Sequence, residues 1–186
     1  MSPAVQHLLS LPPAMAANFH QLFPDSPCPW FVSCDPAGRK LGSGGGVSHL
    51  LAEASAEGGK GFGTWLDETK KLAILAGGQS RRLPAYSATG KVLMPVPLMR
   101  WSHGQRLDQT LLDMQADDYT RILKSAPETS RVLVASGDVF LKIPESLPAI
   151  PEADIVGFGM MVSPETASGF GVFFSPRDSA GGVSFF

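Results

Sequence analysis

Short apolar segments of strand length recur along the chain and are separated by turns or by helix-like stretches. These segments are apolar throughout and lack the polar alternation of a half-exposed strand. Strands buried on both faces need a layer of helices on each side of their sheet, as in parallel α/β folds. We therefore predict an α/β fold with a mostly parallel sheet and helices on both faces. The five predicted strands are WFVSCD (30–35), KLAILAGG (71–78), RVLVASGD (131–138), DIVGFGMMV (154–162) and GVFFS (171–175).

Helical spacing of apolar residues is clearest in residues 105–125, which we predict to form the longest helix. A shorter helix is predicted for VSHLLAEASAEG (47–58), and a single helical turn for WLDETK (65–70). These helices fall between the predicted strands, so the order of elements agrees with the α/β interpretation.

The chain is predicted to divide into an N-terminal helical region, residues 1–29, and one α/β domain, residues 30–186. The first region is rich in leucine and is interrupted by Pro12 and Pro13. The last residues, GVSFF, are apolar, whereas the end of a domain is usually polar and exposed. We therefore expect the α/β domain to be incomplete at its C-terminus.

Composition and charge exclude several classes of protein. The formal net charge is −2, whereas a nucleic-acid-binding domain usually has a strongly basic face. There is no run of 18 apolar residues and no basic and apolar leader of the signal-peptide type, so we expect a cytoplasmic protein with no membrane partner. Cys28 and Cys34 are expected to be reduced thiols, and the four histidines lack the spacing of metal ligands.

The segment LAILAGGQSRRLPAYSATGKVLMPVP (72–97) leads from a buried strand into a glycine pair and an irregular polar loop. Gly77 and Gly78 let the backbone turn sharply and approach a ligand closely. Their amides, together with those of Gln79 and Ser80, can form a nest that binds an anion. The segment therefore predicts a phosphate-binding loop.

Three cations in the same segment strengthen this prediction. Arg81 and Arg82 are forked donors suited to phosphate oxygens, and Lys91 can reach a phosphate as a point charge. The alternative is a turn with a solvated basic pair. The residue order excludes a Walker P-loop, which needs Gly-Lys-Ser/Thr, and it excludes the dinucleotide fingerprint G-x-G-x-x-G.

Two further motifs follow predicted strands. In DPAGRKLGSGGG the residues Gly44, Gly45 and Gly46 are predicted to form a strand-to-helix turn whose amides can hold a phosphate or lie against a base; a flexible connector is the alternative. In VASGDVF the carboxylate of Asp138 directly follows an apolar strand, where it is either a ligand for Mg²⁺ or an exposed turn residue. Ligands of parallel sheets bind at the carboxyl ends of strands, which favours a nucleotide site.

These motifs together resemble a known family. GGQSRRLP, Gly90-Lys91 and Pro95 are similar to the signature loop of sugar-nucleotide pyrophosphorylases. LPAYSATGK followed by PVP, with the earlier Gly-Ser-Gly-Gly-Gly, resembles the GDP-fucose pyrophosphorylase domain of bifunctional fucokinase/fucose-1-phosphate guanylyltransferase enzymes. The resemblance implies a Rossmann-like nucleotidyltransferase core that joins GTP and L-fucose 1-phosphate to give GDP-fucose and pyrophosphate. It implies that Arg82 and Lys91 neutralise the triphosphate and that Asp138 holds Mg²⁺.

The chain also departs from that family. Its gap from Arg82 to Lys91 is longer than in the common signature. The full enzymes carry a C-terminal β-helical region and a sugar kinase, which cannot fit in 186 residues, so we expect a longer parent protein. One alternative is a non-catalytic nucleotide-binding fragment or regulatory domain, and a weaker one is a pyrophosphorylase for mannose or glucose. The sequence leaves the oligomeric state open.

Overall fold

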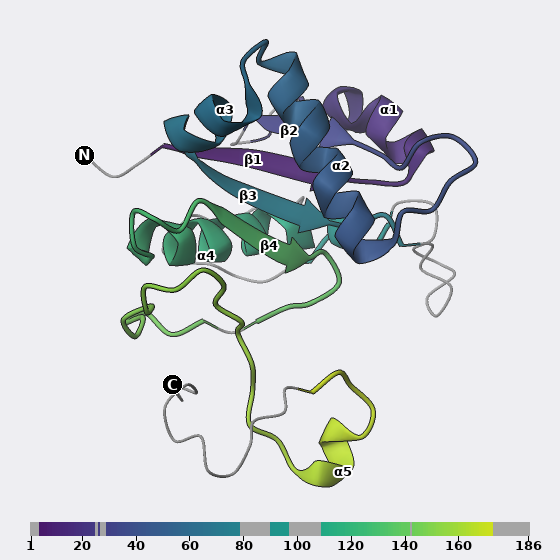
Figure 1. Ribbon diagram of the computed structural model, residues 1–186. Coiled ribbons are helices and arrows are strands. Elements are labelled where there is room, and N and C mark those ends of the chain that lie inside the picture. Colours follow the sequence, from purple (N-terminus) through teal and green to yellow (C-terminus); the bar gives the residue numbers. More distant parts are fainter. Residues whose placement is uncertain are drawn as a thin grey trace.

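The computed structural model describes residues 4–24, 26, 29–78, 90–96, 109–141 and 143–172. Its centre is a four-stranded, all-parallel sheet with the strand order β2-β1-β3-β4 (Figure 1). The strands are β1 (Val5–Ser10), β2 (Trp30–Ser33), β3 (Lys70–Leu75) and β4 (Val132–Ser136). The predictions of strands near residues 30–35, 71–78 and 131–138 are confirmed.

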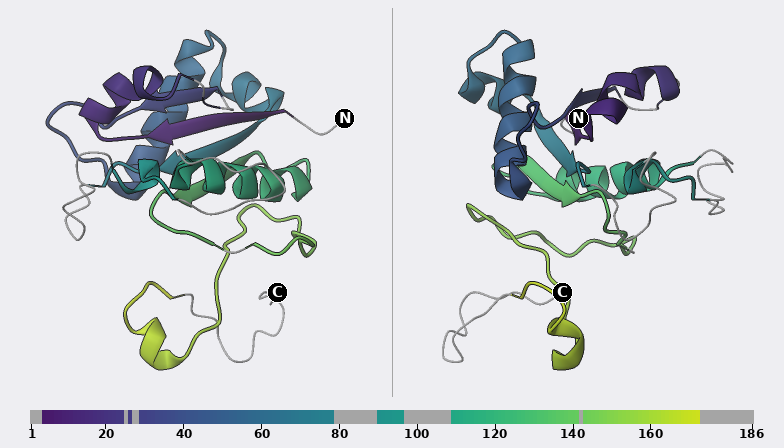
Figure 2. Two further views of the ribbon diagram at one scale, coloured as in Figure 1. Left: turned by 180° about the vertical axis from the view of Figure 1, so that it is seen from behind. Right: turned by 90° about the vertical axis from the view of Figure 1, so that its right-hand side faces the viewer.

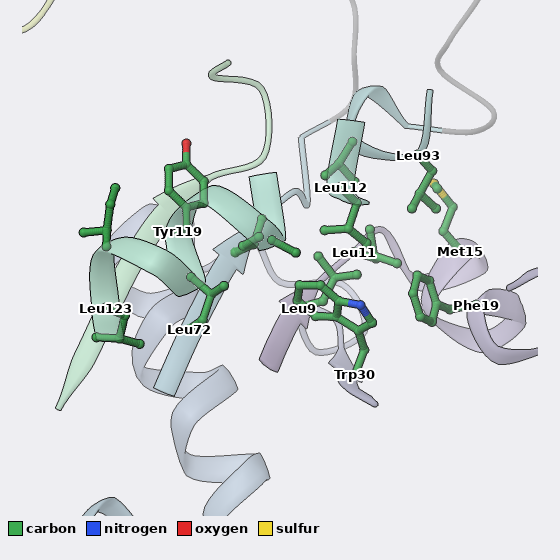
Figure 3. Close-up of a cluster of buried hydrophobic side chains, with 14 residues drawn as sticks. Leu9, Leu11, Met15, Phe19, Trp30, Leu72, Leu93, Leu112, Tyr119 and Leu123 are labelled. Carbon is green, nitrogen blue, oxygen red and sulfur yellow. The ribbon is translucent and has the colours of Figure 1, made fainter. Parts of the chain in front are cut away.

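Helices cover both faces of the sheet, as predicted (Figure 2). One face packs against α1 (Pro13–Leu22) and α4 (Leu111–Ser125) around a large apolar cluster that includes Leu9, Phe19 and Leu72 (Figure 3). The other face packs against α2 (Gly42–Glu57) and α3 (Phe62–Glu68) through a smaller cluster. The α/β, Rossmann-like fold class is therefore confirmed.

The N-terminal segment differs from the prediction of a helical region over residues 1–29. Residues 5–10 form β1, which lies between β2 and β3 and is therefore an inner strand of the sheet. Leu8 and Leu9 are adjacent and both fully buried, because they point to opposite faces of the sheet and each enters a different cluster. A helix forms only beyond Pro12, so the prediction is wrong for β1 and holds for α1.

Two of the predicted strands lie in the last part of the chain. Residues 154–162 form no strand, and the segment extends away from the sheet with Ile155 89% and Met161 81% exposed (Figures 1 and 2). That prediction is wrong, since this apolar run has no neighbouring strand to pair with in the described part of the chain. Of the strand predicted at 171–175, residues 173–175 lie outside the described residues. A short helix, α5 (Pro164–Ala167), lies between these two predicted strands.

The remaining predicted helices are present with shifted bounds. The long helix predicted over residues 105–125 is α4, which begins after Thr110. The Thr110 side chain accepts from the amide of Asp113, and the Asp113 carboxylate accepts from the amide of Thr110, so a capping box fixes this start. The helix predicted over 47–58 is α2, which starts five residues earlier at Gly42.

The crossovers on either side of β3 have opposite hands. From β2 to β3 and from β3 to β4 the chain advances across the sheet in the same direction. The connecting helices α2 and α4 nevertheless lie on opposite faces. Parallel crossovers are right-handed in almost all proteins, so one of these two is an exception. The position of α4 on the face opposite α2 puts it on the same face as α1, where its side chains hydrogen-bond the segment that follows β4.

A buried histidine in β1 makes the stability of this fold depend on pH. The His7 Nε2 hydrogen-bonds the Thr120 hydroxyl at 2.9 Å, and the ring packs edge-on against Trp30. Burial lowers the pKa of His7 below its ordinary value of 6.5, with a smaller contribution from the charge of Lys124 that the charge of Asp117 partly opposes. Between the lowered pKa and 6.5 the unfolded chain binds more protons than the folded chain, so stability falls as pH falls.

We therefore expect the free energy of unfolding, measured by urea denaturation, to decrease as the pH is lowered below 6.5. His7→Gln keeps a hydrogen-bonding side chain but cannot titrate, so it should reduce this dependence. His49→Gln serves as the control, because that histidine is partly exposed and pairs with Glu53 on α2, away from His7. An unchanged pH slope in His7→Gln would contradict the assignment.

Candidate active site at the carboxyl edge of the sheet

The carboxyl ends of all four strands meet at one edge of the sheet. The last residues of the strands lie side by side in register, in the order Ser33, Ser10, Leu75 and Ser136. Three of these four positions therefore place a hydroxyl group at this edge. Gly77, Gly78 and Asp138 follow β3 and β4 within three residues of their last residues, as expected for a ligand site of a parallel sheet, whereas Gly44 to Gly46 and Lys91 come later in the chain.

Gly77 and Gly78 continue β3 at this edge and are both exposed. The chain is held in line with β1 by the hydrogen bond from the Ala76 amide to the Ser10 carbonyl, 2.8 Å. A Cβ placed on Gly77 would lie 3.8 Å from the Ser10 hydroxyl oxygen, so the two strands end close together. Gln79, Ser80, Arg81 and Arg82 lie outside the described residues, and their binding roles stay predictions.

The structure brings Lys91 and Asp138 together, although 46 residues separate them in the sequence. The Lys91 Nζ lies 3.4 Å from the Asp138 Oδ2. Lys91 begins a single 3₁₀ turn, η2 (Lys91–Leu93), which the buried side chains of Val92 and Leu93 attach to the core. The ion pair thus joins the loop after β3 to the turn after β4.

Gly90 gives the backbone a conformation that sets the direction in which Lys91 enters this site. Its φ of 67° and ψ of 151° lie in a region that is open to glycine and strained for other residues. A Cβ at this position would also lie 3.1 Å from the Sδ and Cε atoms of Met15. Glycine at position 90 is therefore needed for the path of the chain into η2.

Asp138 is held as a carboxylate by two donors. The Ser136 hydroxyl donates to its Oδ1 at 2.7 Å, and Lys91 donates to its Oδ2. The hydrogen bond from Ser136 is the main cause that lowers the pKa of Asp138, and the hydrogen bond and charge of Lys91 add to it. The side chain is 53% exposed, so this anion faces solvent at the edge of the sheet.

The donor set around Asp138 fits Mg²⁺ in one of its common binding modes. Within the described ranges no group of three or more His, Cys, Asp or Glu side chains is arranged to hold a metal ion. Mg²⁺ at nucleotide sites is often held by one or two carboxylates, with waters and substrate phosphates as the remaining ligands. An exposed, ionised carboxylate beside a hydroxyl group suits that mode, and Asp138 would supply the protein ligand.

The glycine-rich segment after β2 is part of a helix and not the strand-to-helix turn that the sequence predicts. Gly44, Gly45 and Gly46 all lie within the first turns of α2. The helix start is tied to the end of β2 by the Leu41 amide, which donates to the Asp35 Oδ2 at 3.3 Å. Gly46 is buried, and a Cβ there would lie 3.9 Å from the Asp35 Oδ1. Nucleotide binding by this segment stays a prediction.

The sequence interpretation missed the polar residues that support this edge. Ser136 lies two residues before Asp138 and is the first cause of its lowered pKa. Gln115, an inward-facing residue of α4, donates to carbonyls of the segment that contains Asp138. A serine that ends an apolar strand is a signal that can be found in sequence. Gln115 gives a weaker signal, because its helical spacing groups it with core residues.

Comparison with known proteins identifies the family. The family model for the fucose pyrophosphorylase domain matches residues 63–184. This chain belongs to that family. The match includes Gly77, Gly78, Lys91 and Asp138, and the segment with Gly44 to Gly46 precedes it.

A relative of this fucose pyrophosphorylase domain is the L-fucokinase/L-fucose-1-P guanylyltransferase of Bacteroides fragilis, which is 47% identical over 175 residues. The alignment covers 93% of this chain and 18% of the relative, so the chain spans less than a fifth of that protein. No solved structure matches the chain. Among the described residues, no helix is both long enough and apolar enough to cross a membrane.

Proposed function

We propose that this chain carries the nucleotidyl-transfer site of a fucose-1-phosphate guanylyltransferase. The reaction joins GTP and L-fucose 1-phosphate to give GDP-fucose and pyrophosphate, with Mg²⁺. The observation that carries the proposal is the meeting of Lys91 and Asp138 at the carboxyl edge of the sheet, the edge at which Gly77 and Gly78 follow β3, in a chain of the fucose pyrophosphorylase family.

The reaction needs positioning more than it needs reactive side chains. A phosphate oxygen of the sugar 1-phosphate forms a bond to the α-phosphorus of GTP, while the bond from that phosphorus to the oxygen bridging it to the β-phosphate breaks. Pyrophosphate takes the electron pair and leaves. The attacking phosphate is already an anion, so no general base is required. The protein must therefore hold two anionic substrates together and neutralise their charge.

Each residue of the site has a part in this task. Lys91 would donate to phosphate oxygens of the triphosphate, and the exposed backbone at Gly77 and Gly78 leaves room for the phosphates to approach. Asp138 would hold Mg²⁺, which supplies positive charge to phosphate oxygens when it is bound. In the structure the Lys91 ammonium is bound to Asp138, so binding of a metal–nucleotide complex would exchange this partner for phosphate. Arg82 is proposed to assist Lys91, with Arg81, Gln79 and Ser80 also contacting the nucleotide.

A second function is a nucleotide-binding fragment without turnover. Its support is that the chain spans only 18% of the B. fragilis relative, which leaves most of that protein unmatched. Specificity for guanine and for fucose is proposed from the family and from the activities for which that relative is named.

Pyrophosphate release distinguishes these two functions. The chain would be incubated with Mg²⁺, L-fucose 1-phosphate and each of GTP, ATP, UTP and CTP in turn. If the chain is the enzyme, we expect pyrophosphate release that needs both GTP and L-fucose 1-phosphate. Binding of a fluorescent GTP analogue without release from any nucleotide would favour the non-catalytic fragment, and replacing fucose 1-phosphate by mannose or glucose 1-phosphate tests the sugar.

Asp138→Asn tests the proposed metal ligand. Loss of the charge should raise the Mg²⁺ concentration needed for half-maximal transfer by about tenfold or more, since even residues that only support a metal ligand typically contribute 10–100-fold. The measurement is pyrophosphate release as a function of Mg²⁺ concentration. Asp154→Asn, at an exposed carboxylate of the extended segment, is the control. An unaltered Mg²⁺ response would place the metal ligand elsewhere.

A further inference from the structure

A buried polar contact connects α4 to the turn that carries Asp138. Gln115 is 2% exposed, and its Nε2 donates to the carbonyl oxygen of Val139 and, at 3.4 Å, to that of Ser136. The Tyr119 hydroxyl, one helical turn further along α4, donates to the same Val139 carbonyl at 3.3 Å. The Tyr119 ring lies in the apolar cluster while its hydroxyl points away from it (Figure 3). The two carbonyls flank Asp138 on both sides.

We propose that Gln115 is a positioning residue that fixes the turn Ser136–Val139 and thereby the direction of the Asp138 carboxylate. The effect of this role on metal binding rests on the function proposed above for Asp138. In this role Gln115 itself touches neither substrate nor metal. It acts through the backbone of the turn, in the way that residues behind a metal ligand orient it.

The hydrogen bonding of Gln115 favours such a role over a contribution to stability. In the described part of the chain its Oε1 atom is buried without a hydrogen-bond partner. A buried polar atom without a partner destabilises the fold, so an apolar side chain of the same length would suit this place in the core at least as well. What only glutamine supplies at this position is the Nε2 donor that contacts the turn.

Among the described residues, the turn is also attached through the Lys91–Asp138 ion pair and through its backbone. The Gly137 amide donates to the Leu75 carbonyl at 2.8 Å, which ties one end of the turn to β3. The side chains of Val139 and Phe140 are 41% and 51% exposed and do not bury the other end. Leu141, just beyond the turn, packs against the large apolar cluster, and between it and Asp138 the side chains of Gln115 and Tyr119 supply hydrogen bonds to the backbone of the turn itself.

Gln115→Met tests this role, because methionine keeps the length and removes the donor. The first readout, in metal-free protein, is amide hydrogen exchange of residues 137–140. The second is the affinity for Mn²⁺ in the presence of GTP, followed by the electron paramagnetic resonance signal of free Mn²⁺. We expect exchange in the turn to become faster and Mn²⁺ binding to weaken by about tenfold. Tyr119→Phe, which removes the second donor to Val139, should show a smaller change in the same direction.

Ile122→Val is the matched control, since it weakens the core side of the same helix without touching the turn. Wild-type exchange and Mn²⁺ affinity in Gln115→Met would overturn the proposal, and so would changes equal to those of Ile122→Val. Failure of the proposed function gives a different result. If Asp138→Asn leaves Mn²⁺ affinity unchanged, Asp138 is not the metal ligand, while the exchange data still decide whether Gln115 fixes the turn.

Discussion

Lys91→Ala is expected to lower kcat/KM for GDP-fucose formation by about 100-fold or more, with the fold intact. The size follows from the usual effect of removing one donor that stabilises charge developing in a transition state. Among the described residues, the Lys91 ammonium contacts the carboxylate of Asp138. This ion pair is partly exposed, so its loss should cost little stability. The adjacent Val92 and Leu93 keep η2 attached to the core. The rate would be measured as pyrophosphate release, and the fold by circular dichroism and thermal unfolding.

Two other variants define what Lys91 contributes. Lys60→Ala removes an exposed lysine that pairs with Glu68 away from the carboxyl edge, and it should leave transfer unchanged. Lys91→Arg keeps the charge but replaces a compact ammonium with a planar fork, so it should recover only part of the rate. Wild-type transfer by Lys91→Ala would remove Lys91 from the mechanism.

Gly137→Ala is expected to lower the free energy of unfolding by about 1–3 kcal/mol, the usual cost of forcing atoms into a well-packed place. A Cβ at position 137 would lie 2.7 Å from the Cβ of Ala76, 3.2 Å from the Leu75 carbonyl oxygen and 3.3 Å from the Ala76 Cα. Two of these three are backbone atoms of the chain that leaves β3, so they cannot move aside as the end of a flexible side chain can. Relief requires β3 and β4 to separate at the carboxyl edge.

Urea denaturation at neutral pH measures this cost. Gly63→Ala in α3 is the matched control, because a Cβ there meets nothing within 4 Å. Alanine is also the better helix former, so the control should be neutral or stabilised by up to about 1 kcal/mol. Equal stability of Gly137→Ala and wild type would show that β3 and β4 are not packed this closely. Since Asp138 follows directly, the substitution should also weaken Mg²⁺-dependent transfer.

The part of the fold that the sequence predicts best is the part where local pattern and tertiary packing agree. The apolar runs of β2 and β3 are long enough for strands and are buried or partly buried in the sheet, and β4 is partly buried except at the exposed Val134 and Ser136. The regular apolar spacing of α4 is matched by its contact with the large cluster. In β2, β3 and α4, the apolar residues that the sequence pattern singles out are also residues that pack against the rest of the fold.

The wrong predictions fall on segments whose structure depends on the strands that lie beside them in the fold. β1 is rich in leucine, which favours a helix locally, but its place between two strands makes it extended. Residues 154–162 have a strand-like apolar pattern and no strand beside them in the described ranges. A local sequence pattern does not show the two strands that flank β1. It also does not show that residues 154–162 have no strand beside them in the described ranges.

Two buried lysines illustrate the same limit. Lys70 and Lys71 are each 1% exposed at the start of β3, where charged residues would be expected at the surface. The Lys70 ammonium donates to three carbonyls at the end of α4, and the Lys71 ammonium donates to carbonyls at the end of α3. Each lysine thus satisfies the last carbonyls of a helix on a different face of the sheet. The sequence shows the charges but cannot show these acceptors.

The candidate site was predicted from residue types that follow strands, and the structure adds how they meet. The sequence singles out Lys91 and Asp138 separately, and the fold places them 3.4 Å apart because β3 and β4 are neighbours. Ser136 has a signal in its place at the end of an apolar strand, whereas Gln115 could not be assigned to the site from spacing, since its role depends on the turn after β4.

The most direct test of the account is formation of GDP-fucose by this chain. The protein would be incubated with GTP, L-fucose 1-phosphate and Mg²⁺, and the nucleotide products separated by ion-exchange chromatography and identified by mass, with Lys91→Ala as the parallel sample. We expect GDP-fucose and an equal amount of pyrophosphate from the wild type and strongly reduced amounts from the variant. GTP bound but returned unchanged, with no GDP-fucose, would contradict the proposed enzyme and leave the nucleotide-binding fragment as the function.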